Sequence, residues 1–361
     1  MVNGSLGDCI VKEGINVLVG MPTGRRPRAI VLGCTGEVLG AGERDFFSEA
    51  DPAGFILFRR NCASPGQVRR LVDELRGCVG RADAAVLIDQ EGGRVARLRP
   101  PGWRRYPSAA QIAALPEAIA EPAAWLGARL IADDLARLGV TVDCMPVLDL
   151  PVPGADPVIG DRAYGGEPDR VVRLARAVCE GLIAGGVLPV LKHIPGHGRA
   201  GVDSHHACPV VDTEHRDLSR TDFAPFRALA AMPWAMTAHI VYRAIDDSAP
   251  ATFSRKVIGE IIRGEIGFDG ILISDDLSMR ALGGGLGERA ERALAAGCDL
   301  VLHCNGNIAE MEEVAAAAAP VTAEAAERLG RGAAIRSRPA DEFDRAEAEH
   351  RFDALLAKVL S

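Results

Sequence analysis

The sequence predicts an α/β protein folded as a single (β/α)8 barrel of the TIM type. Three observations favour this fold. Eight short apolar runs recur along the chain, stretches of helix-like periodicity separate them, and polar residues gather where the runs end. A chain of 361 residues is long enough for one such barrel. No glycine-rich motif of the dinucleotide-binding or P-loop kind follows the first run, which weakens the doubly wound alternative.

Two helices between the predicted strands have clear end signals. A helix over 64–79 is indicated by Ser64, which can cap its first turn, and by Pro65, which suits the first helical position. A helix over 168–186 ends on glycines. The predicted strands cover residues 29–33, 54–58, 84–89, 142–150, 187–193, 234–240, 270–276 and 298–304.

The order of these elements divides the chain into three expected parts. Residues 1–27 form an N-terminal extension, residues 28–335 form the catalytic barrel, and residues 336–361 form a helical tail that packs on the barrel. The nine cysteines are scattered and contain no CxxC pair, so neither a disulfide framework nor a cysteine zinc site is indicated.

Charge and hydropathy exclude several classes of partner. The net charge of −8 and the isoelectric point near 5.6 argue against a nucleic-acid partner. No apolar run approaches the roughly 20 residues that a membrane-spanning helix needs, so no membrane partner is expected. Asp8, Lys12 and Glu13 interrupt the region where a signal peptide needs an unbroken apolar stretch, which predicts a cytoplasmic protein. The sequence carries no prediction of oligomeric state.

Polar residues end several of the predicted strands. Asp89 ends the third, Lys192 and His193 end the fifth, and Asp275 and Asp276 end the seventh. Because the C-terminal ends of parallel strands meet at one end of a barrel, these groups predict a polar ligand site there. Asp275 and Asp276 should point to opposite faces of their strand, so only one of them can serve this site.

Other polar residues near the same strand ends favour structural roles to different degrees. Asp149 fits equally a role in holding backbone amides and a role in contacting a ligand. His239 and His303, taken one at a time, are more typical of packed core histidines than of ligands.

The segment KHIPGHGRAGVDSHH, residues 192–206, permits three interpretations. His193, His197, Asp203 and His205 could bind a metal such as zinc or manganese. The glycines could present backbone amides to a phosphate, although no helix start with Ser or Thr follows. Alternatively, the carboxylate of Asp203 could orient His205 for proton transfer. Spacing alone favours the metal and proton-transfer readings equally, with a purely structural polar loop close behind.

Six separated motifs resemble one known family. FILFRRNCASPGQVRRLVDELR, LIDQEGGRVARL, IGDRAYG, KHIPGHG, VDSHH and ISDDLSM occur in this order. Together they are similar to the bacterial β-N-acetylhexosaminidases of glycoside hydrolase family 3, of the NagZ type used in peptidoglycan recycling. The resemblance covers residues 28 to about 310. It implies a single barrel and retaining hydrolysis of terminal, non-reducing β-linked N-acetylglucosamine from N-acetylglucosaminyl-anhydromuramyl peptides.

The resemblance also implies roles for individual residues. Asp275 matches the nucleophile of the family, His205 matches its acid/base, and Asp203 matches the partner of that histidine. Neither a metal nor another cofactor is required by this chemistry. Five further residues match the positions that bind the sugar, namely Asp89, Arg97, Arg162, Lys192 and His193.

Two departures from the family pattern and two alternatives remain. Arg199 and Ala200 stand where many relatives carry Asp and Thr, and His206 adds a second histidine that could share the acid/base role. The first alternative is a metal-dependent hydrolase that uses the cluster of His193, His197, Asp203 and His205. The second is a non-catalytic carbohydrate-binding protein on the same fold.

Overall fold

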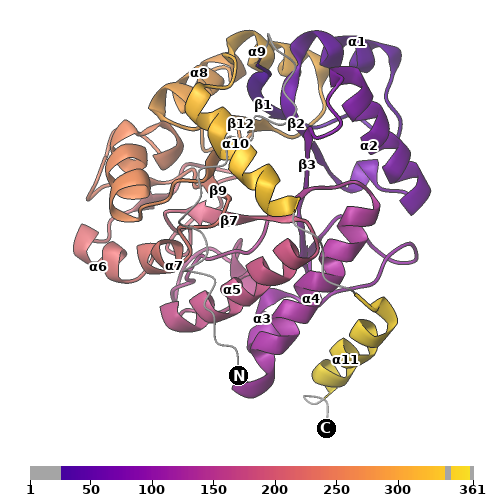
Figure 1. Cartoon of the computed structure of the whole chain (residues 1–361). Helices are drawn as coiled ribbons and strands as arrows, with labels where there is room; N and C mark the ends of the chain where they lie inside the picture. Colours follow the sequence, from indigo (N-terminus) through magenta and orange to yellow (C-terminus); the bar gives the residue numbers. More distant parts are fainter. Residues whose placement is uncertain (1–25, 338–342, 358–361) are drawn as a thin grey trace.

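The structure is a computed structural model that describes residues 26–337 and 343–357. Its centre is a closed barrel of eight parallel strands in the order β1-β12-β11-β9-β7-β6-β3-β2, so the (β/α)8 prediction is confirmed (Figure 1). The predicted extension over residues 1–27 lies almost entirely outside the described residues. The barrel strands are β1 Arg28–Leu32, β2 Pro52–Leu57, β3 Ala85–Ile88, β6 Val142–Asp143, β7 Leu188–Ile194, β9 Trp234–Thr237, β11 Ile271–Asp276 and β12 Leu300–His303.

Alternating side chains of the barrel strands divide most of the described core into two large apolar clusters. On β1, Ala29 and Val31 belong to the cluster inside the barrel, whereas Ile30 and Leu32 face the surrounding helices. Both faces are therefore apolar, which is why these strands appear in the sequence as continuous hydrophobic runs. Barrel closure pairs the first strand with the last, with Ile30 opposite Val301.

Helices follow the strands and cover the outside of the barrel. The predicted end signals of α2 are present: the Ser64 side chain accepts the N–H of Gln67, and Pro65 is the first helical residue. The helices are α1 Ala41–Ala50, α2 Pro65–Val79, α3 Ala109–Ala113, α4 Glu117–Arg137, α5 Pro168–Ala184, α6 His215–Arg220, α7 Phe223–Ala228, the π-helix η5 Val257–Glu265, α8 Leu286–Ala296, α9 Ile308–Ala317, α10 Ala323–Arg336 and α11 Arg345–Ala357.

One predicted strand is too long. The prediction over residues 142–150 corresponds to only two residues of β6, followed by an isolated bridge between Val147 and Lys192. Pro146 has no N–H to donate to a neighbouring strand, so the regular ladder stops before it. The buried, apolar chain beyond β6 looks like strand in the sequence because it crosses the same core.

Helix α10 covers the N-terminal end of the barrel (Figure 1). Its Arg328 forms ion pairs with Asp299, just before β12, and with Asp269, just before β11. Asp299 also accepts bonds from Arg263 of η5 and from the backbone N–H of Leu272, both at 2.8 Å. We call these groups, together with Arg331, the floor cluster.

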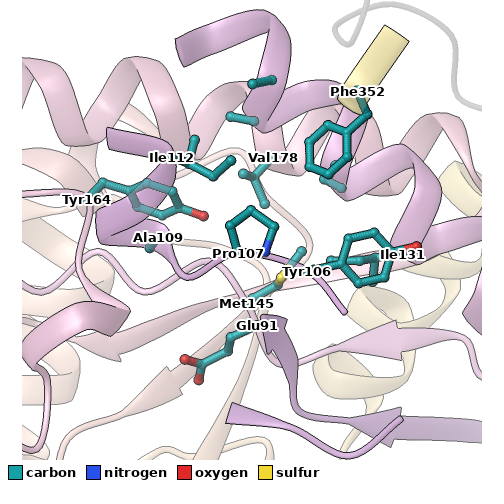
Figure 2. A pocket seen from close by; sticks show the side chains of 14 residues that line it. Glu91, Tyr106, Pro107, Ala109, Ile112, Ile131, Met145, Tyr164, Val178 and Phe352 are labelled. Atoms are coloured by element: carbon teal, nitrogen blue, oxygen red, sulfur yellow. The ribbon is translucent and has the colours of Figure 1, made fainter. Parts of the chain in front are cut away.

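Helix α11, in the predicted tail, lies beside α4 (Figure 1). Its fully buried Phe352 contacts Gly127 of α4 and the ring of Tyr106. Figure 2 shows a small, mostly apolar cavity with Phe352 on one side and Glu91 on another. Two short two-stranded sheets lie outside the barrel: β4 Gln90–Gly92 with β5 Val95–Ala96, and β8 Val210–Val211 with β10 Val241–Tyr242. Among the described residues, no helix is both long and apolar enough to cross a membrane.

Candidate active site

The apolar interior of the barrel ends in a layer of charged side chains at the C-terminal end of the strands. Two positions along a strand lead from one inward side chain to the next. On three strands, the residue two positions before a charged one belongs to the inner apolar cluster: Leu87 before Asp89, Val190 before Lys192, and Ile273 before Asp275. These three predicted site residues therefore lie at the same end of the barrel.

Lys192 is the centre of a buried ionic cluster. Its Nζ lies 2.9 Å from Asp89 Oδ1 and 2.7 Å from Glu91 Oε1, and its side chain is only 2% exposed. Burial opposes the charge on this ammonium group, but the two carboxylates outweigh it and raise the pKa of Lys192 above its ordinary value. Arg97 donates to Asp89 Oδ2 at 2.8 Å, and burial of this carboxyl is outweighed by Lys192 and Arg97, which lower its pKa.

Glu91 is the site residue that the sequence prediction missed. Arg162 holds both of its carboxylate oxygens, through Nε at 2.9 Å and Nη2 at 2.8 Å. Although burial disfavours the charge, Lys192 and Arg162 lower the pKa of Glu91 to about 2. Arg162, predicted from the resemblance as a sugar-binding residue, is thus fixed in a bidentate ion pair. The signal available in the sequence was position, because Glu91 lies two residues after Asp89 on the same side of the β3 end.

Asp275 faces His193 across the site. The distance from Asp275 Oδ2 to His193 Nε2 is 4.0 Å, and Asp275 Oδ1 accepts the backbone N–H of Asp276 at 2.8 Å. Burial alone would raise the pKa of Asp275, but the neighbouring His193 and His239 and the Asp276 N–H lower it. The carboxyl is therefore held as an anion, with His239 fixed in turn by Thr252 and by the Asp276 carbonyl.

Asp149 positions the histidines of the fifth strand and its loop. Its Oδ1 accepts the backbone N–H groups of His193 and His197, at 3.1 and 2.6 Å. Its Oδ2 lies 2.7 Å from His193 Nδ1, which leaves Nε2 of that ring directed at Asp275. Of the two roles that the sequence left open for Asp149, the observed contacts are those of a residue that holds backbone amides.

The loop after β7 carries the predicted proton-transfer pair. His205 Nδ1 lies 2.7 Å from Asp203 Oδ1, which also accepts the His205 backbone N–H at 2.8 Å. The imidazole is 62% exposed, and no ion pair in the described part of the chain joins it to Asp275. Burial slightly opposes the charge of Asp203, but its bonds to His205 lower the pKa of the carboxyl. His206 is also exposed and lies one position further along this loop.

Several contacts fix the loop on the barrel. His197 Nε2 lies 3.2 Å from Ser204 Oγ, and the Ser204 carbonyl accepts the N–H of Ala281 in the loop after β11. The His205 loop is therefore bonded to the loop that follows Asp275. Arg199, one of the departures from the family pattern, donates to Asp222 beside α7 at 2.7 Å.

The four residues of the metal alternative do not converge. His193 bonds to Asp149, His197 bonds to Ser204, and Asp203 bonds to His205. Within residues 26–337 and 343–357, no group of three or more His, Cys, Asp or Glu side chains is arranged to hold a metal ion. Burial and the neighbouring His193 lower the pKa of His197 to about 4, so this ring is neutral near pH 7.

Residues 41–329 match the N-terminal domain of glycosyl hydrolase family 3. The chain belongs to glycoside hydrolase family 3. The motifs predict a family 3 glycoside hydrolase of the NagZ type. The family match and relatives named β-hexosaminidase confirm this prediction. The protein from Alkalilimnicola ehrlichii is 41% identical over 287 residues, which are 76% of this chain and 80% of that protein. The Pseudomonas aeruginosa protein is 41% identical over 282 residues, which are 77% of this chain and 82% of that protein.

Solved structures of family 3 members have the same fold. NagZ from Neisseria gonorrhoeae, in complex with N-trifluoroacetyl-D-glucosamine, is 31% identical with a TM-score of 0.80, over 93% of this chain and 98% of that one. A family 3 β-N-acetylglucosaminidase from Paenibacillus is 32% identical with a TM-score of 0.80, over 91% of this chain and 67% of that one. The family match and these relatives show that the chain is a glycoside hydrolase, so the alternative of a non-catalytic carbohydrate-binding protein is not retained.

Proposed function

We propose that this glycoside hydrolase is a retaining exo-β-N-acetylglucosaminidase. Its substrate is terminal, non-reducing β-linked N-acetylglucosamine on peptidoglycan fragments of the N-acetylglucosaminyl-anhydromuramyl peptide type, in the cytoplasm. The observation that carries the proposal is the inward-facing carboxylate of Asp275, 4.0 Å from His193, at the same end of the barrel as the Asp203–His205 pair. The Paenibacillus relative, named a β-N-acetylglucosaminidase, and the complex of the Neisseria gonorrhoeae NagZ with N-trifluoroacetyl-D-glucosamine support the choice of sugar.

The reaction proceeds through two displacements at the anomeric carbon. Asp275 attacks this carbon and forms a glycosyl ester, while the glycosidic oxygen leaves with a proton from His205. Water then gives a proton to His205 and attacks the same carbon, which releases the sugar and restores the Asp275 carboxylate. Two inversions give net retention. The lowered pKa of Asp275 supports its role as a nucleophile, because the attacking group must be ionised.

Asp203 acts on the reaction through His205. Its carboxylate bonds to Nδ1 of the ring, which fixes the tautomer, leaves Nε2 for the glycosidic oxygen and stabilises the imidazolium form. The sugar is held by the five residues that match the family, Asp89, Arg97, Arg162, Lys192 and His193. Their carboxylate, guanidinium and ammonium groups are suited to ring hydroxyls and to the acetamide carbonyl.

The decisive experiment compares release of 4-nitrophenol from the β-N-acetylglucosaminide and from the matching β-glucoside, with chelator present. We expect turnover of the N-acetyl substrate only, and its loss in Asp275→Ala with the fold retained by circular dichroism. An Asp275→Ala variant that keeps most of its activity would refute the nucleophile. Loss of wild-type activity with chelator would instead support the metal-dependent alternative.

A further inference from the structure

An arginine-lined hollow lies beside the site, at the same end of the barrel. It has a volume of about 370 Å3 and is formed by the end of β2 and by the segment from Gly93 to Tyr106. Half of its ten lining residues are arginines, and no lining residue that the structure describes is acidic. The arginines are Arg59, Arg94, Arg99, Arg104 and Arg105. In a chain with a net charge of −8, such a concentration of positive charge needs an explanation.

In the part of the chain that the structure describes, carboxylates pair with only two of these five arginines. Arg94 pairs with Asp161 at 2.7 Å, and Arg104 pairs with Asp353 of α11. The other three, Arg59, Arg99 and Arg105, are exposed and form no ion pair within the described ranges. Among the described residues, three guanidinium groups of the hollow are therefore left without a carboxylate partner.

Part of the hollow is held in place by hydrogen bonds. Arg99 donates through Nε to the Ala96 carbonyl at 2.8 Å and through Nη2 to the Arg94 carbonyl at 3.2 Å. Arg104 is further oriented by the rings of Tyr106 and Phe352. Because these side chains are ordered before a ligand arrives, binding costs less side-chain entropy.

The hollow lies next to the buried ionic cluster around Lys192. Ala96 lines the hollow, and the next residue, Arg97, donates to Asp89. On the β2 side, Arg59 follows Phe58. The guanidinium carbon of Arg97 lies over the Phe58 ring, 4.9 Å from its centroid. A ligand in the hollow would thus lie one residue away from groups that contact the sugar.

We propose that this hollow is an oxyanion-binding site next to the sugar site, in which Arg59, Arg99 and Arg105 bind carboxylate or phosphate groups. Guanidinium groups bind both kinds of anion through paired N–H donors. Two sources offer this chemistry: the carboxylates on the peptide part of the substrate, which rests on the proposed function, and free inorganic phosphate.

The test uses the double variant Arg99→Gln/Arg105→Gln. A matched control, Arg216→Gln/Arg220→Gln, removes the same charge from exposed positions on α6, away from the hollow. For each protein, calorimetry gives the dissociation constant for inorganic phosphate. Steady-state kinetics give KM for 4-nitrophenyl β-N-acetylglucosaminide, which is uncharged, and for a glycoside of the same sugar with a carboxylate-bearing muramyl peptide.

If the substrate supplies the anion, the double variant raises KM for the peptide glycoside about tenfold, as expected for about 1.4 kcal/mol of lost binding. KM for the neutral glycoside stays unchanged. If inorganic phosphate is the ligand, its dissociation constant is about tenfold higher for the double variant, and the KM values for both glycosides are unchanged. The proposal is overturned when the double variant matches the control in all three measurements. If the proposed function is wrong, the wild type turns over neither glycoside. The dissociation constants for phosphate can still be compared in that case.

Discussion

Asp275 and Asp276 are adjacent in the chain, yet they contribute to different parts of the molecule. Asp275 faces His193 inside the barrel, while Asp276 accepts the N–H of Cys304 and bonds to Ser278. Strand alternation predicts that only one of the two can enter the site. The same rule could not identify the partner of Arg162, because that arginine and Glu91 are 71 positions apart and meet only in the folded chain.

If His205 is the proton donor, as proposed, the effect of removing it should depend on the leaving group. Replacing His205 with alanine removes the acid, so we expect a loss of about 100-fold or more in kcat/KM for a substrate with a poor, alkoxide-like leaving group. Release of 4-nitrophenol should fall much less in the glycosylation step, because that leaving group needs no protonation. The measurement is kcat/KM for both substrates.

His206→Ala is the matched control for this experiment. It alters the neighbouring exposed histidine and should leave both values near those of the wild type. Equal losses for the two leaving groups in His205→Ala would contradict the acid role. A leaving-group effect confined to His206→Ala would move the role to that residue.

We expect the contribution of Asp143 to the free energy of unfolding to depend on pH. Its carboxyl is fully buried, Oδ1 accepts the Gln90 N–H at 2.9 Å, and Oδ2 has no hydrogen-bond partner among the described residues. Burial raises the pKa of Asp143 to about 8. A carboxyl with a raised pKa contributes its full stability below the unfolded-state pKa of about 4 and loses it as the pH rises to the folded-state value.

The variant Asp143→Asn is neutral at every pH and similar in shape. Its free energy of unfolding, relative to the wild type, should increase by on the order of 1 kcal/mol per pH unit between pH 5 and 7. Urea unfolding at pH 5, 6 and 7 measures this difference. A difference that is constant with pH would show that Asp143 is already ionised in the folded protein.

At the level of secondary structure, the sequence was most informative about the strands. Each of the eight predicted runs overlaps a barrel strand, because burial on both faces leaves a continuous apolar signal. Strand ends were less predictable: the apolar chain after β6 continues through the core, but it pairs with β7 only through the isolated bridge between Val147 and Lys192. The short β4–β5 hairpin, which places Glu91 and Arg97, has no such signal because its residues are polar and glycine-rich.

Replacing either of two glycines in the loop after β7 with alanine should have a different effect on activity. A Cβ atom on Gly198 would lie 1.9 Å from the Leu150 carbonyl oxygen, whereas one on Gly201 would meet nothing within 4 Å. Gly198→Ala must therefore displace the loop that carries Asp203 and His205, and we expect kcat/KM to fall at least tenfold. Gly201→Ala should retain near-wild-type kcat/KM. Similar values for the two variants would contradict a fixed loop.

Considered as a whole, the molecule has its candidate active site at one end of the barrel and the floor cluster at the other. In the floor cluster, Asp299 is 6% exposed and holds Arg263, Arg328 and the Leu272 N–H. Asp299→Ala leaves two arginines without this partner, and we expect a loss of about 3 kcal/mol in the free energy of unfolding. Urea unfolding measures the loss, and kcat/KM of the folded variant should be unchanged.

Glu327→Ala is the control for Asp299→Ala. Glu327 is exposed on α10, the same helix that supplies Arg328, and its replacement should change the free energy of unfolding by less than about 0.5 kcal/mol. If Asp299→Ala lowers kcat/KM as strongly as it lowers stability, the two ends of the barrel are not independent.

The closure of one barrel end by α10 has a consequence for how the protein can evolve. Substitutions that stabilise the protein against heat can accumulate in α10 and the residues it contacts, without changing the residues proposed to bind the sugar. Substitutions that alter the substrate can accumulate in the loops at the opposite end. Selection for thermal stability and selection for a new substrate therefore act on separate sets of positions, so the two properties can change in either order.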